Sequence, residues 1–571
     1  MKRVIAAVSI LVCSVLSGRI FLQSASAAIT ADVAPADIVV TGAEIYTVNG
    51  SRSWAHALAV KDGKFVFVGE DKPALRLVGP ATKVLQMHGE MILPGFHDSH
   101  IHPIDSGIEL SQCRLDEAIS KADVLSAIAK YVKEHPTDPW ILGGGWSLPL
   151  FPNACPLKED LDKIIPDRPA YFGSQDAHSA WVNSAALKLA KIDKTTPNPS
   201  LGIIERKADG EPSGTLRESA TDLVSALAPK PSDKDRQDGL LRTLKMAGQF
   251  GITSLQDANA DEDSLRTYEQ IGKSGNLTVR VVACLHVNPS SGAEQVNDFV
   301  KLREKYSSEY VRPTSAKIFA DGVVESHTAA LLEPYSDKPD TSGTLNFKTD
   351  QLNSIVNALD KANFQVHVHA IGDRAVNEAL NALEFARKEN GFNDNRHHIA
   401  HLELIKPADI ARFRKLNVVA NFQPFWAYKD PYITECTEPL LGPERTGRLY
   451  QINSVMKTGA VVAAGSDWSV TTMNPLDAIQ IAVTRKELDD KKGAAWIPNE
   501  RVSLPEILAS YTINGAYINH QETVTGSIEA GKDADFIVLD KNLFVVDDAD
   551  IHKVTVLSTY LRGKPVFQKG E

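Results

Sequence analysis

From about residue 93 to 519, short apolar runs alternate with longer stretches whose apolar residues recur with helical spacing. Strands that alternate with helices favour a parallel α/β sheet, and eight such units predict a closed barrel. We therefore expect an α/β fold whose main domain, residues 93–519, is a (β/α)8 TIM-type barrel. Eight apolar runs have the length of strands, and they end near His100, Asp257, Val287, Ala320, His369, His401, Asn421 and Asp467.

Two features lie outside this alternation. The first and second apolar runs are separated by far more residues than one loop and one helix need, so we expect a large insertion after the first strand, at about 105–240. Both ends of the chain carry strand-like runs, with a hairpin signal at Asp62-Gly63. We expect these runs to form one small β-sandwich domain from residues 29–92 and 520–571.

The first 28 residues differ from the rest of the chain. Lys2 and Arg3 precede an apolar run at 4–16, and small residues follow at 24–28. This pattern is typical of a secretory signal peptide, so we expect residues 1–28 to be removed and the protein to be exported to a bacterial periplasm or secreted. The alternative is a membrane anchor, but the run is shorter than the ~20 residues of a span. No later segment has the length and apolarity of a membrane span.

Charge and cysteine content exclude other classes of protein. The chain has 571 residues and a net charge of −11, without a block of Lys and Arg, so we expect no nucleic-acid partner. The five cysteines form no CxxC pair, which argues against a cysteine-based zinc site. Cys113 and Cys155 are close enough in sequence to be considered as a disulfide in an exported protein, but the sequence does not establish the bond.

Residues that could bind a metal or transfer a proton occur at the ends of the predicted strands. His100 and His102 are two residues apart, so on a strand both imidazoles face one side and can bind one ion. The alternative is a pair of surface histidines in a loop. Function in such barrels lies at the carboxyl ends of strands. Later strand ends supply further ligands or acid/base groups, namely Lys317, His369, His401 and Asp467.

Each of these assignments has a structural alternative. Lys317 lies in an apolar run, where a buried ammonium needs a partner, and it could form a structural salt bridge instead. His367 shares a face with His369 and is either an alternative ligand or a supporting group. Asp467 could cap the following helix. Asp98 shares the face of His100 and is a candidate supporting residue.

Several motifs resemble the amidohydrolase superfamily, and most closely its family 3 branch of YtcJ-like and N-substituted formamide deformylase-like proteins. Two departures are His97, where the family usually has an aliphatic residue, and Ala400, where an acidic residue is common. The resemblance covers nearly the whole chain after the signal. It rests on PGFHDSHIH (94–102), WILGGGW (140–146), DAHSAWVNSAAL (176–187), GEPSGTLRE (210–218), AKIFADG (316–322), TAALLEPY (328–335), HAIGDRAV (369–376), HHIAHLELI (397–405), AAGSDW (463–468), TINGA (512–516) and GSIEAGKDADFIVLD (526–540).

The resemblance implies a metal-dependent hydrolase with one or two divalent ions, zinc being the default choice. His100 and His102 would bind the more buried metal, and His369 and His401 the second. Lys317 matches a position that carries a carboxylated lysine in many relatives. Asp467 would contact the metal and shuttle a proton while a metal-activated hydroxide cleaves a non-peptide C–N bond of an amide, formamide or cyclic amide, or an ester.

The substrate itself is expected to be a small molecule. His178 is the strongest candidate for a substrate contact, because it lies in a motif that resembles the family's, and Trp146 is a second. Aromatic residues in the loops and insertion either line a pocket or pack the insertion; besides Trp146 they are Trp181, Phe425 and Trp426.

The resemblance also makes a homo-oligomer an open expectation. Two other functions stay open: a non-catalytic binding or regulatory protein on the same scaffold, and a metal-free enzyme that uses Lys317 as a Schiff-base nucleophile. Metal content distinguishes both from the hydrolase.

Overall fold

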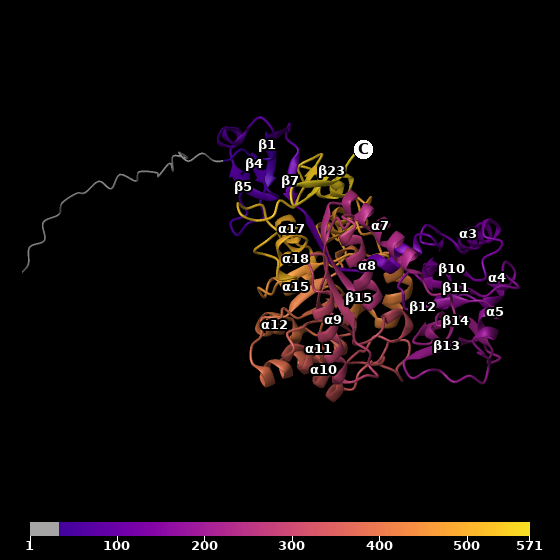
Figure 1. Ribbon diagram of the computed structural model, residues 1–571. Coiled ribbons are helices and arrows are strands. Elements are labelled where there is room, and N and C mark those ends of the chain that lie inside the picture. Colours follow the sequence, from indigo (N-terminus) through magenta and orange to yellow (C-terminus); the bar gives the residue numbers. More distant parts are fainter. Residues whose placement is uncertain (1–33, 571) are drawn as a thin grey trace, which may run out of the picture.

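The computed structural model describes residues 34–570 (Figure 1). The predicted signal peptide at 1–28 therefore lies outside the described residues. The predicted barrel is present: eight parallel strands form one sheet in the order β21-β20-β19-β18-β17-β16-β15-β8. These strands are β8 (Phe96–Ile101), β15 (Ile252–Ala260), β16 (Arg280–His286), β17 (Arg312–Phe319), β18 (Gln365–Ala370), β19 (His398–His401), β20 (Val419–Phe422) and β21 (Val462–Ala464).

The barrel closes between its first and last strands through main-chain contacts just beyond β21. The N–H of Asp467 donates to the carbonyl of His100 at 2.8 Å. Gly465 makes this approach possible, because a Cβ at that position would lie 2.5 Å from the His100 nitrogen. The contact that closes the barrel thus also fixes two of the candidate site residues next to each other.

Helices cover the outside of the barrel and bury their apolar faces against it. In α10 (Thr349–Lys361), Leu352, Ile355, Val356 and Leu359 recur with helical spacing and are all buried. Other members of this layer are α7 (Asp233–Gln249), α8 (Glu262–Lys273), α9 (Val296–Tyr306), α11 (Asp373–Asn390), α12 (Pro407–Leu416), α15 (Ile452–Met456) and α16 (Pro475–Thr484). The helices lie on the outside of the barrel, and the polar residues at the ends of the strands line the cavity.

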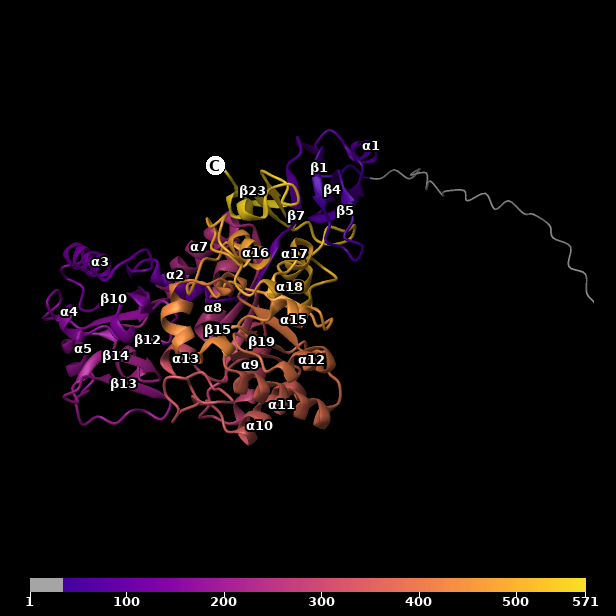
Figure 2. The same ribbon diagram turned by 180° about the vertical axis from the view of Figure 1, so that it is seen from behind.

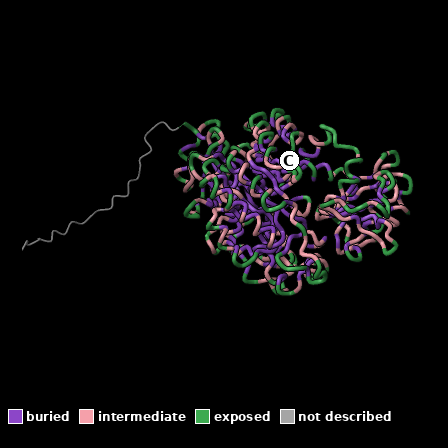
Figure 3. Tube along the Cα trace, turned by 90° about the horizontal axis from the view of Figure 1, so that it is seen from below, coloured by how far each residue is buried: buried purple, intermediate pink, exposed green. Residues whose placement is uncertain are grey.

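The segment between β8 and β15 contains a second sheet beside the barrel, visible in both ribbon views (Figures 1 and 2). Its strand order is β13-β14-β12-β11-β10-β9. It has its own apolar core, and Figure 3 shows buried chain inside this lobe as well as inside the barrel. The strands are β9 (Cys113–Arg114), β10 (Ile141–Trp146), β11 (Ala170–Ser174), β12 (Ser179–Val182), β13 (Gly202–Arg206) and β14 (Pro212–Glu218).

Both ends of the chain contribute to one sheet, as expected. β7 (Met91–Pro94) pairs antiparallel with β22 (Phe536–Leu539), in the order β24-β23-β22-β7-β2-β3. A four-stranded sheet, β5-β4-β1-β6, lies at the same end of the molecule (Figure 1). The remaining strands are β1 (Ile38–Thr41), β2 (Glu44–Tyr46), β3 (Trp54–Ala55), β4 (Ala57–Lys61), β5 (Lys64–Gly69), β6 (Lys83–Gln86), β23 (Val556–Leu561) and β24 (Lys564–Gln568).

Two other expectations concern the described chain. Within residues 34–570, no helix combines the length and apolarity needed to cross a membrane. Cys113 and Cys155 both carry free thiols, so the disulfide considered for them is not formed.

Candidate metal centre and cavity

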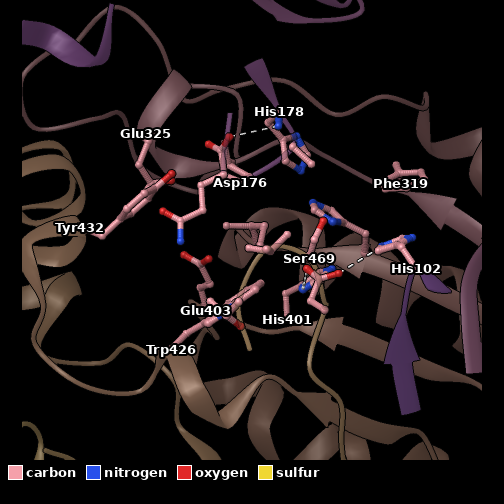
Figure 4. A pocket seen from close by; sticks show the side chains of 18 of the residues that line it. His102, Asp176, His178, Phe319, Glu325, His401, Glu403, Trp426, Tyr432 and Ser469 are labelled. Atoms are coloured by element: carbon pink, nitrogen blue, oxygen red, sulfur yellow. Dashed lines mark hydrogen bonds and ion pairs between the residues drawn. The ribbon is translucent and has the colours of Figure 1, made fainter. Parts of the chain in front are cut away.

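Asp467 lies at the centre of a cluster formed by the first and last strands. His100 and His102, on and just after β8, place their Nε2 atoms 3.3 and 3.1 Å from Asp467 Oδ1. The alternation of side chains along β8 puts both rings on the same face, as the spacing predicts. Lys317, on β17, brings its Nζ to 3.3 Å from His100 Nε2. Figure 4 shows His102 and His401 from different strands facing this centre.

His369 and His401 form the other side of the cluster. Their rings lie 4.5 Å apart, and His401 Nδ1 lies 3.8 Å from Asp467 Oδ2. His369 Nε2 is 3.2 Å from the carbonyl of Gly322, which can only accept, so this nitrogen carries the proton and Nδ1 keeps a lone pair. One ligand atom each from His100, His401 and Asp467 lies within 4.8 Å of the others.

The protonation states suit a cation. Burial lowers the pKa of His100 to about 3 and holds the pKa of His369 and His401 well below the ordinary value. Burial would raise the pKa of Asp467, but the neighbouring histidines hold it well below its usual range. Burial also lowers the pKa of Lys317 to about 8. Neutral imidazoles and an ionised carboxylate are the forms that bind divalent metals, so His100, His369, His401 and Asp467 fit such an ion.

The inserted sheet contributes an ion pair to the same cavity. His178, just before β12, places Nδ1 2.9 Å from Oε2 of Glu218, the last residue of β14. Burial lowers the pKa of His178, but the charge and hydrogen bond of Glu218 outweigh it and raise the pKa to about 9. Glu218 also accepts hydrogen bonds from Ser326 and Thr328 of the barrel loops. The His178 ring lies 5.4 Å from His369, so a charged imidazolium faces the metal cluster.

These residues line one cavity of about 850 Å³ between the barrel mouth and the insertion. His178 and His401 lie on its walls, and Trp426 stacks parallel to His401 at 5.5 Å between ring centroids (Figure 4). A cavity of this size accommodates a small molecule. The arrangement therefore combines metal-binding groups, a carboxylate and a fixed imidazolium around one substrate-sized space.

The model of the Amidohydrolase family matches residues 83–567, which is most of the chain. The protein belongs to the amidohydrolase family. It is 31% identical to the putative amidohydrolase YtcJ of Bacillus subtilis over 92% of this chain and 99% of that one. It is 26% identical to the N-substituted formamide deformylase of Arthrobacter pascens over 92% of this chain and 97% of that one.

A solved structure supports the same relationship. An uncharacterized metal-dependent hydrolase from Pyrococcus furiosus superposes with a TM-score of 0.68 and is 25% identical. The alignment covers 88% of this chain and 99% of that chain. The resemblance inferred from the motifs is confirmed, and the fold and family together identify this amidohydrolase as a hydrolase.

The structure settles where the alternative residues lie. In this amidohydrolase His367 does not line the cavity; it lies behind His100, with its Nε2 2.8 Å from His100 Nδ1. Asp467 is not a helix cap, since α16 starts at Pro475 and is capped by Asn474. Asp98 supports the site, because its Oδ1 accepts the N–H groups of His100 and Ser466.

The expectation that Trp146 contacts substrate is corrected. Its side chain is completely buried in the core of the inserted sheet, and its Nε1 donates to the carbonyl of Phe172 at 2.9 Å. Trp181 is buried in the same core, whereas Phe425 and Trp426 line the cavity. Trp146 and Trp181 are therefore packing residues, because their apolar surface is buried in the core of the insertion.

Two residues that organise the cavity were not predicted from the sequence. Glu218 ends the motif GEPSGTLRE (210–218), whose sequence alone assigns it no role. Asp321 follows Lys317 in AKIFADG (316–322) and accepts three backbone N–H groups, from Ala330, Ile371 and Gly372. It thereby holds together the loops that follow β17 and β18. Their positions within family-like motifs were the available signal.

Proposed function

We propose that this amidohydrolase cleaves a non-peptide C–N bond of a small amide, formamide or cyclic amide with the help of a divalent metal, zinc being the first choice. The observation that carries the proposal is the buried cluster of His100, His401 and Asp467, whose ligand atoms lie within 4.8 Å at the floor of the cavity. His102, His369 and Lys317 complete the set of residues that would hold one or two ions. Such an ion lowers the pKa of water and polarises a carbonyl.

Lys317 suits conversion to a carboxylated lysine. Its amine is completely buried, and a pKa of about 8 leaves part of it neutral near neutral pH. A neutral amine adds to carbon dioxide and releases a proton, which gives a carbamate that carries one negative charge. The change would replace a buried cation without an acidic partner in the described chain by an anion suited to bind metal.

The remaining chemistry is assigned to Asp467 and His178. Asp467 lines the cavity and its pKa is well below the usual range, so it is ionised and can accept the proton of the attacking water and deliver it to the leaving nitrogen. The His178 imidazolium, fixed by Glu218, can donate a hydrogen bond to the carbonyl oxygen as negative charge develops there. A neutral histidine would serve this purpose less well.

The test combines metal analysis with a substrate screen. Purified protein should contain one to two equivalents of a divalent metal by elemental analysis, and a panel of amides, formamides, cyclic amides and esters should include substrates. Asp467→Asn should retain the fold and lose turnover. A wild-type protein that takes up no metal on reconstitution would overturn the proposal and favour a binding or regulatory protein.

We also propose that the protein is exported, because the first 28 residues carry the pattern of a secretory signal. N-terminal sequencing of the protein recovered from the periplasm or medium of a bacterial host tests this. A protein that keeps residue 1 and stays in the cytoplasm would contradict it.

A further inference from the structure

His100 is the first link of a buried hydrogen-bond chain that runs away from the cavity. Its Nδ1 lies 2.8 Å from Nε2 of His367 on β18. The other ring nitrogen of His367, Nδ1, lies 3.3 Å from the sulfur of Cys284 on β16. His367 and Cys284 are completely buried and do not line the cavity, whereas His100 faces it. Buried polar groups of this kind are satisfied by one another, so the proton of His367 is used within the chain.

Lys317 sets the direction of the chain. Its ammonium can only donate, and its Nζ lies 3.3 Å from His100 Nε2, so that nitrogen is the acceptor. A neutral imidazole carries a single N–H, which leaves the proton of His100 on Nδ1.

This anchoring sets the direction of every bond. The Nε2 of His367 accepts Nδ1–H of His100, so His367 carries its own proton on Nδ1 and donates it to the sulfur of Cys284. The lone pair of His100 is left on Nε2. That atom faces the cluster, 3.3 Å from Lys317 Nζ and 3.3 Å from Asp467 Oδ1.

The opposite arrangement would disable the site. The Asp467 carboxylate accepts hydrogen bonds only, so by itself it would draw the proton of His100 onto Nε2. A protonated Nε2 has no lone pair for a metal. Some group behind His100 must therefore hold the proton on Nδ1, which is the usual task of partners behind a metal-binding imidazole.

We propose that His367 and Cys284 are positioning residues that fix His100 in the Nδ1–H tautomer and so present its Nε2 lone pair to the metal. The inference rests on the proposed metal centre, but its subject is the tautomer of His100. Neither His367 nor Cys284 lines the cavity, so neither contacts substrate. A sulfur atom in the barrel interior thus has a defined part in the metal centre.

The first measurement is zinc affinity by competition with a chromogenic chelator, on the full chain without its signal. His367→Phe and Cys284→Val each remove one link, and each should weaken zinc binding by about 10- to 100-fold. Cys284→Ser keeps a group that both accepts and donates, and it should bind zinc as the wild type does. The matched control is His398→Phe, since His398 is equally buried and packs against His367, with tilted rings 4.0 Å apart, without belonging to the chain.

The second measurement needs neither metal nor activity. Metal-free protein with ¹⁵N-labelled histidine should show His100 with a protonated Nδ1 and an unprotonated Nε2, assigned by the loss of its signals in His100→Ala. Cys284→Val should give a mixture of tautomers at His100, and Cys284→Ser should not. Thermal unfolding of each variant identifies any that fails to fold, and in that case the remaining cysteine variants decide the question.

The outcomes are distinct. Equal losses of zinc affinity in His398→Phe and His367→Phe, or an Nε2–H tautomer in the wild type, would overturn the inference. A wild type that binds no metal would overturn the proposed function, while the tautomer of His100 in the metal-free protein would still decide the inference.

Discussion

Replacing Glu218 by Gln should remove the positive charge from the cavity at neutral pH. In the wild type, Glu218 raises the pKa of His178 from its ordinary 6.5 to about 9, against the effect of burial. This difference corresponds to about 3 kcal/mol of preference for the charged form. Both side chains are largely buried, with 17% and 15% exposed, so solvent screens the pair only weakly. Without the carboxylate, burial remains and we expect the pKa to fall to 6.5 or below.

The assay is NMR titration of the His178 ring, which requires no substrate. The wild type should titrate near pH 9 and Glu218→Gln at least two pH units lower. Glu205→Gln is the matched control, because Glu205 pairs with Arg217 in the same sheet and forms no hydrogen bond or ion pair with His178. Because folding raises the pKa of His178, the ion pair of His178 with Glu218 stabilises the folded protein fully below pH 6.5. This stabilisation is lost as the pH rises through about 9. Titration of wild-type His178 near 6.5 would refute the reasoning.

The remaining predictions concern the metal cluster, the barrel closure and the insertion. His100→Ala should lose most of its metal by elemental analysis, whereas the exposed His88→Ala should keep it; equal metal contents would count against the site. Asp467→Asn should lower kcat by about 10²- to 10⁴-fold on a substrate from the screen, and unchanged turnover would exclude Asp467 as the proton carrier. Gly465→Ala should weaken metal binding and lower the Tm, because its Cβ would collide with the His100 backbone at 2.5 Å; a variant with normal zinc affinity would contradict this. Trp146→Ala should cost about 3–5 kcal/mol of stability in urea denaturation with little effect on KM, and a raised KM at normal stability would restore Trp146 as a substrate contact.

The strands of the barrel could be predicted because each one has a recognisable pattern in its own few residues. A strand buried on both faces reads as an apolar run, and the polar residue that ends it marks the barrel mouth. His100, His102, Lys317, His401 and Asp467 were found on this basis, and the structure brings them together. Period-2 alternation could not separate His367 from His369, because both face the barrel interior. They differ in depth along the strand, where two residues span about 6.6 Å.

The insertion resisted the same reasoning. Its tryptophans were visible in the sequence, but the choice between lining a pocket and packing a core depends on which face of the inserted sheet meets the barrel. Trp146 lies on the face that packs into the core of the insertion, and its indole N–H donates to the carbonyl of Phe172. The pairing of His178 with Glu218 was likewise hidden, since it joins residues 40 positions apart in the sequence. One lies just before β12 and the other ends β14, and these strands come side by side only in the folded sheet.

The sequence by itself determined the eight-stranded barrel, the two-ended terminal sheet, the family and the residues of the cluster, because hydrophobic periodicity and motif spacing are local properties of the chain. The tertiary structure decided how His178 and Glu218 reach the cavity, which histidine of β18 faces it, and which groups stand behind His100. Those assignments depend on the depth, register and packing of segments far apart in sequence. A pattern along the sequence does not specify how far apart two such segments lie, and a hydrogen bond forms only when its two atoms come within about 3 Å.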